Sequence, residues 1–224
     1  MLKTFYLFIT LVIIGLIQSY RTPFWNDEVY TQKNLKQYSY MQIIEGKLPE
    51  GCNEPLFYVI QKADHDSMLF PIICMALAIS LVFYVLLIDF GIKYAVLGVV
   101  LFLLPRITWQ HFPECRPYSL IVLLTTLQWT VVRIELVAVV NILMAFTDTI
   151  CIVPILMATF LACKNNIKYI WIAILPTIII AYYFYVSVYK GNPYNLTTIA
   201  GLSNRYFIYL LPIGALRLVD WVIK

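Results

Sequence analysis

Charged residues are scarce in this sequence. Only 12% of its 224 residues are Asp, Glu, Lys or Arg, whereas 62% are hydrophobic, and the mean hydropathy is +0.81. Soluble domains carry about 25% charged residues, roughly twice this share. The deficit excludes an ordinary soluble globular protein and predicts an integral membrane protein with several membrane-spanning segments.

Two further absences narrow the range of functions. The net charge of +4 arises without any run of Lys or Arg, so a nucleic-acid partner has no support. The five cysteines include no C-x-x-C pair, and their spacing is not typical of a metal site. Catalysis or binding therefore has to come from other polar residues.

Eight apolar runs dominate the sequence. Because a transmembrane helix needs about 20 apolar residues, they predict an all-α integral membrane protein, a polytopic bundle of about seven to eight transmembrane helices. We expect residues 1–224 to form a single transmembrane domain. The predicted spans are 5–20, 69–88, 94–104, 118–132, 136–146, 150–162, 169–189 and 206–223. The balance of Lys and Arg between the two sides does not decide the orientation.

The longest polar segment, residues 21–68, is predicted to be the first extracytoplasmic loop. Within it, residues 28–45 contain no proline or glycine and carry an apolar residue at every third position. This pattern predicts one amphipathic helix lying along the membrane. Its apolar stripe consists of Leu35, Tyr38, Met41 and Ile44. A second surface helix is predicted to begin at Pro55, because proline fits the first helical turn.

An acidic pair, Asp27-Glu28, stands directly after the first apolar run. Charge inside the bilayer costs several kcal/mol, and the neighbouring Phe24 and Trp25 suit the headgroup zone. The pair is therefore predicted at the membrane surface, where a carboxylate can take a proton from an acceptor hydroxyl. Asn26, Asp27 and Glu28 also suit the start of a helix. Capping and catalysis are compatible, so the spacing leaves both interpretations open.

Other polar residues are predicted on the same side of the membrane, because each follows an odd number of spans. They are Glu54, Glu114, Arg116 and Asp148. An arginine can hold a phosphate through two parallel hydrogen bonds, although Arg116 could instead pair with Glu114 at the interface. His111 is interpreted as a polar interfacial residue. An Asp-Glu pair can bind a divalent cation, but nothing in the spacing requires a metal.

The order of three motifs resembles the GT-C glycosyltransferases, most closely the protein O-mannosyltransferase and aminoarabinose-transferase-like family. Trp25-x-Asp27-Glu28 follows the first span, Glu54-Pro55-Leu56-Phe57-Tyr58 closes the first loop, and Arg116-Pro117-Tyr118-Ser119-Leu120 opens the fourth span. The resemblance covers residues 1–189. Two features depart from it: Glu54 replaces a histidine, and the later helices and C-terminal domain of the family have no counterpart.

The resemblance implies a multi-pass enzyme that moves a sugar from a polyprenyl-phosphate carrier to an acceptor lipid, glycan or protein. The active face would be extracytoplasmic or lumenal, in contact with membrane lipids. Asp27 would be the catalytic base beside Glu28, and Arg116 would contact the carrier phosphate. The implied substrate-binding residues are Glu54, Glu114, Arg116 and Tyr118.

Two other functions fit the same composition. One is a catalytically inactive membrane subunit that keeps the fold, and the other is a small transporter whose intramembrane charges line a path. A single outer-face cavity holding Asp27 and Arg116 would favour the enzyme. A charged path through mid-membrane would favour transport, and dispersed charges would favour the subunit.

Overall fold

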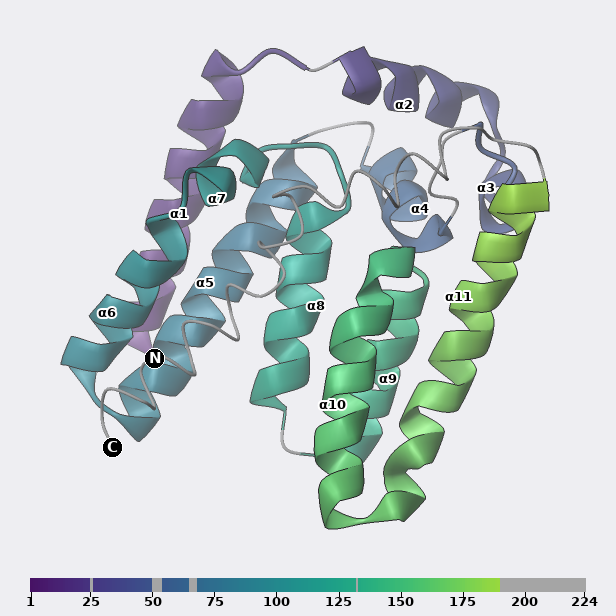
Figure 1. The fold of residues 1–224 in the computed structure, drawn as a ribbon. Helices are drawn as coiled ribbons and strands as arrows, with labels where there is room; N and C mark the ends of the chain where they lie inside the picture. The colour runs from purple at the N-terminus through teal and green to yellow at the C-terminus, as the bar shows by residue number, and fades with distance from the viewer. Residues whose placement is uncertain (25, 50–53, 65–67, 132, 190–224) are drawn as a thin grey trace. The chain divides into compact units, whose positions relative to one another are not determined.

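The computed structural model describes residues 1–189 except 25, 50–53, 65–67 and 132 (Figure 1). This part of the chain is all-helical and contains no strand, as the composition predicts. Every apolar run predicted between residues 5 and 189 forms a helix within a few residues of its expected bounds. The eighth predicted span, 206–223, lies outside the described residues.

The chain divides into two compact units. The first takes its described residues from Met1–Phe24 and Ser67–Thr130, and the second from Trp25–Asp66 and Val131–Ser203. Each unit has buried hydrophobic residues of its own. The single membrane domain over residues 1–224 stays a prediction.

The first unit is organised around one long helix. Its helices are α1 (Leu2–Arg21), α5 (Leu69–Asp89), α6 (Ile92–Leu103), α7 (Arg106–His111) and α8 (Tyr118–Thr130). Helix α5 packs against α1, α6 and α8, which explains why it is apolar on every face (Figure 1). Between α5 and α6, Gly91 adopts a φ of +88°, a conformation that glycine enters without steric cost.

The second unit combines the first-loop helices with three apolar helices. The former are α2 (Asn26–Gln37), α3 (Tyr40–Ile44) and α4 (Pro55–Ala63). The latter are α9 (Ile134–Ala145), α10 (Ile152–Asn165) and α11 (Trp171–Tyr189), with short 3-10 turns η1 (Thr149–Cys151) and η2 (Ile167–Ile170). Figure 1 shows α9, α10 and α11 side by side, and the buried Asn141 amide donates to the carbonyl of Ile172 at 3.2 Å.

Three segments are long and apolar enough to cross a membrane. They are α1, α5 and Ile167–Val186, which combines η2 with most of α11. Three further apolar segments are shorter: Ile92–Leu103, Ile134–Ala145 and Thr149–Lys164. The described residues thus contain three candidate membrane spans, which is compatible with a membrane protein.

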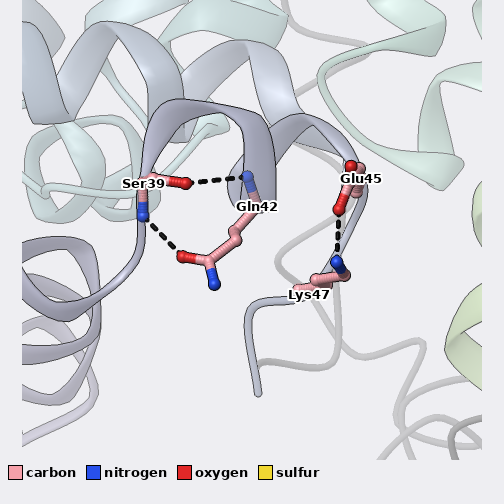
Figure 2. A network of polar contacts seen from close by, with 4 residues as sticks. All are labelled: Ser39, Gln42, Glu45 and Lys47. Carbon is pink, nitrogen blue, oxygen red and sulfur yellow. Dashed lines mark hydrogen bonds and ion pairs between the residues drawn. The ribbon is translucent and has the colours of Figure 1, made fainter.

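The prediction of a single amphipathic helix over residues 28–45 is wrong, because the structure has two separate helices there, α2 and α3. Ser39 stands between them and forms a capping box with Gln42 (Figure 2). The Ser39 hydroxyl accepts the Gln42 N–H at 3.3 Å, and the Gln42 side chain accepts the Ser39 N–H at 2.8 Å. A capping box starts a new helix, so it competes with continuation of the previous one.

The break also changes which face of this segment is buried. Of the predicted stripe, Leu35 is buried but Met41 and Ile44 are exposed, and Ile43 is buried in their place. Where a new helix begins, the angular position of every later residue around the helix axis changes. A three-residue spacing that spans the break therefore no longer marks one face. The second surface helix does begin at Pro55, as predicted.

Candidate functional site

The acidic pair of the first loop lies in the first turn of a helix. Helix α2 begins at Asn26, shortly after α1 ends at Arg21, so Asp27 and Glu28 are its second and third residues. Acidic residues in the first turn of a helix favour it by interacting with its positive end; that Asn26, Asp27 and Glu28 cap α2 stays a prediction. Glu28 is only 1% exposed. A carboxylate so deeply buried is more than a solvated helix cap.

Glu54 is hydrogen-bonded to a residue of the second unit that lies far from it in the sequence. It precedes Pro55, the first residue of α4, but its side chain does not cap that helix. Its carboxylate instead accepts a hydrogen bond from the hydroxyl of Thr149 in η1. Next to it, the Leu56 N–H donates to the carbonyl of Phe146 at 2.8 Å. The first turn of a helix has N–H groups with no intrahelical partner, and here one of them joins α4 to the end of α9.

Asp148 lies close in sequence to Phe146, where α4 and α9 are joined, and its pKa is raised. Its side chain accepts the Ile150 N–H at 2.9 Å and so caps η1, and the residue is 9% exposed. Burial, followed by the negative charge of Glu54, raises the pKa of Asp148 to about 7, although the bond from Ile150 opposes the shift. Two buried carboxylates favour retention of a proton. Asp148 can therefore take up or release a proton near neutral pH.

Tyr183 supports the same junction from α11, a role that the sequence did not reveal. Its hydroxyl donates to the carbonyl of Ile44 at 3.0 Å, and its ring lies edge-on to Phe146 with the ring centres 6.0 Å apart. Helix α11 is thereby tied to the end of α3 and to the α9–η1 connection. We call Glu54, Asp148, Thr149 and Tyr183 the acidic junction.

A second polar group belongs to the first unit. His111, at the end of α7, pairs through Nδ1 with the carboxylate of Glu114, and its ring centre lies 4.6 Å from that of Tyr118. The Arg116 N–H donates to the carbonyl of Glu114 at 2.8 Å. The carboxylate of Glu114 therefore pairs with His111, and not with Arg116 as one sequence interpretation had it. His111 is buried, with 2% of its surface exposed; its place at the membrane interface stays a prediction.

The predicted site residues divide between the two units. Glu28, Glu54 and Asp148 lie in the second unit, with Asp27 at the start of its helix α2. Glu114, Arg116 and Tyr118 lie in the first. A common cavity for Asp27 and Arg116 stays a prediction. No group of three or more His, Cys, Asp and Glu that could hold a metal gathers among the described residues, and a cation at the acidic pair also stays a prediction.

No family model matches this chain, and neither does any curated protein or solved structure. The GT-C resemblance is carried by the three short motifs and their order along the helices.

Proposed function

We propose that this protein is a membrane glycosyltransferase of the GT-C type, which uses a polyprenyl-phosphate sugar on the extracytoplasmic or lumenal face. The observation that carries the proposal is the place of Asp27-Glu28. The pair opens a helix immediately after the candidate span α1, where the motif order of that family has its acidic pair.

In the proposed reaction, different residues act on the acceptor hydroxyl and on the phosphate of the donor. The acceptor hydroxyl oxygen attacks the anomeric carbon of the sugar while the carboxylate of Asp27 takes the hydroxyl proton. The bond between that carbon and the phosphate oxygen breaks, and its electron pair leaves with the polyprenyl phosphate. Arg116 holds this phosphate through paired hydrogen bonds, with Tyr118 and Glu114 beside it. Glu28 and Glu54 line the acceptor side.

The lengths of the shorter helices support a site within the membrane region. Helices α6 and α9 have 12 residues each, which is about 18 Å at 1.5 Å per residue. The hydrocarbon core is about 30 Å thick. In the proposed bundle of seven or eight spans, such short helices leave non-helical backbone at membrane depth, and this backbone has to line protein or water. The charged phosphate of a lipid carrier lies at the headgroup level, where a cavity lined by this backbone would open.

The test is sugar transfer by the purified protein in lipid vesicles, with a labelled polyprenyl-phosphate sugar and a panel of acceptor alcohols. Asp27→Asn should abolish transfer and leave carrier binding nearly intact, because it removes basicity at constant shape. Arg116→Ala should weaken carrier binding by about 10- to 100-fold, the loss of charge-assisted bonds worth roughly 1.5–3 kcal/mol.

Matched controls are available on exposed surfaces of the same chain. Asp89→Asn and Arg133→Ala make the same chemical changes at exposed positions and should keep wild-type transfer and binding. Full activity in Asp27→Asn would make the mechanism wrong. Carrier binding without transfer by the wild type, across the whole panel, would instead indicate a subunit that keeps the fold without the chemistry.

A further inference from the structure

The acidic junction joins the first-loop helix α4 to the connection between α9 and η1. The Leu56 N–H donates to the carbonyl of Phe146 at 2.8 Å, and the Thr149 hydroxyl donates to the carboxylate of Glu54. The first bond belongs to the main chain, and the second engages a carboxylate that can bind a proton. The start of α4 is therefore held at two points, and one of them depends on protonation.

The other two helices of the first loop are connected to the same place. Lys62, near the end of α4, donates to the carbonyl of Leu35 in α2. The Tyr183 hydroxyl of α11 donates to the carbonyl of Ile44 at the end of α3 at 3.0 Å. A change at the acidic junction therefore acts on α2, α3 and α4 together.

Two carboxyl groups meet at this junction with very little access to water. Glu54 is 1% exposed and Asp148 is 9% exposed. Asp148 accepts the Ile150 N–H at 2.9 Å, which fixes its side chain at the start of η1. Burial and the charge of Glu54 raise the pKa of Asp148 to about 7. The two groups interact, so the bound proton belongs to the pair.

The other titratable groups around η1 stay neutral near pH 7. They are the thiol of Cys151 on η1 and the hydroxyl of Tyr183 on α11. Solvated thiols and phenols ionise at about pH 8.5 and 10, and burial raises such values further. Helix α11 contains no Asp, Glu, Lys or Arg. The charged residues of α9 and α10, Glu135 and Lys164, stand at the ends away from η1.

We propose that the acidic junction is a pH-operated latch, in which one proton shared by Glu54 and Asp148 holds α4 against η1. When this proton leaves to the solvent, two negative charges face each other in a site where burial disfavours charge. Opening the contact lets water solvate both carboxylates, at the expense of the bonds from Thr149 and Leu56. The first loop is thus held more firmly at acidic than at neutral pH.

Cys151 is a built-in reporter of this opening. It is completely buried in η1, so N-ethylmaleimide reaches its thiol only when the junction opens. The full-length wild type in detergent is alkylated between pH 5 and 8, and mass spectrometry gives the rate at each cysteine. Each rate is divided by that of the unfolded chain at the same pH, which removes the intrinsic titration of the thiol.

The ratio for Cys151 should rise with pH by up to about tenfold per pH unit and level off above about pH 7, because opening releases one proton. Cys74, which is also buried, in α5 of the first unit, should show no such rise. Asp148→Asn should abolish the rise at Cys151, since its amide needs no proton and still offers an oxygen to Ile150. The exposed substitution Asp89→Asn should keep it.

Three results would overturn the latch. A ratio for Cys151 that does not change with pH would show that the junction does not open on losing its proton. A parallel rise at Cys74 would mean that the whole fold responds and not this contact. A rise that persists in Asp148→Asn would assign the effect to another group. Should that variant fail to fold, the comparison of Cys151 with Cys74 in the wild type decides. Sugar transfer takes no part in this test, so its absence would leave the latch standing.

Discussion

Asp148 shows how a single buried residue links pH to stability. Its pKa is raised from an ordinary value of 3.8 to about 7, first by burial and then by the charge of Glu54. Between these two values the folded protein binds more protons than the unfolded chain. The contribution of Asp148 to the free energy of unfolding therefore falls as pH rises from about 4 to about 7, and levels off above that range.

We expect Asp148→Asn to flatten this fall, since the amide needs no proton to remain neutral. The variant should melt at a higher temperature than the wild type at pH 8 and lose that advantage near pH 4. Thermal unfolding of the purified protein in detergent across this range measures the effect. The exposed substitution Asp89→Asn should keep the wild-type slope. An unchanged slope in Asp148→Asn would show that another group governs the pH dependence.

The junction of α1 with α5 depends on the absence of a side chain at Gly15. A Cβ atom there would lie 2.6 Å from the Ile72 Cγ2 of α5 and 2.6 Å from the Phe112 ring. Both neighbours are completely buried and cannot move aside easily. Small residues at such positions allow membrane helices to approach closely.

We expect Gly15→Ala to destabilise the protein by about 1–3 kcal/mol, the usual cost of overpacking. Gly98→Ala is the matched comparison in α6, where the nearest atom is Leu86 Cδ1 at 2.2 Å. That atom is the end of a flexible side chain, whereas at Gly15 the neighbours are a methyl group on the branched Cβ of Ile72 and the rigid ring of Phe112. The gain in helix propensity of about 1 kcal/mol is common to both substitutions. Denaturant unfolding in mixed micelles should therefore rank Gly15→Ala as the more damaging change. The reverse order would contradict this packing.

Helix positions were predictable wherever they depend on local sequence. The run predicted over residues 69–88 forms α5 (Leu69–Asp89), because length and apolar content alone decide such a helix. The break at Ser39 was missed because an amphipathic spacing hid a capping box. The partners of the site residues were harder still. Thr149 lies 95 residues from Glu54 and Tyr183 lies 139 from Ile44, so only tertiary packing brings them together.

At the scale of the whole molecule, the candidate spans differ in what surrounds them. Helix α5 is mostly buried, whereas α1, which is also apolar enough to cross a membrane, is mostly exposed. Its exposed apolar side chains include Phe5, Tyr6, Ile13 and Ile17. An exposed apolar helix is stable where lipid covers it, and we expect α1 to lie at the periphery of the membrane domain.

The predicted topology places the first loop and the α6–α8 connection on one side of the membrane. Because Glu54 and Asp148 are buried, exposed positions are better reporters. Cysteines at Lys47 and Gln110 should react with an impermeant maleimide from one side, and cysteines at Lys93 and Lys164 only from the other. Intact and permeabilised cells provide the comparison, with Cys163 replaced to lower the background. Labelling of Lys47 and Lys93 positions from the same side would make the alternation wrong.

The bond from the Leu56 N–H to the Phe146 carbonyl has a consequence for protein engineering. It belongs to the main chain, so it holds positions 54 and 148 near each other whichever side chains they carry. A library that varies Glu54, Asp148 and Thr149 together would change the chemistry of this spot while the main-chain bond between Leu56 and Phe146 is kept. The acidic junction is for this reason the part of the second unit best suited to receive a new reactive group.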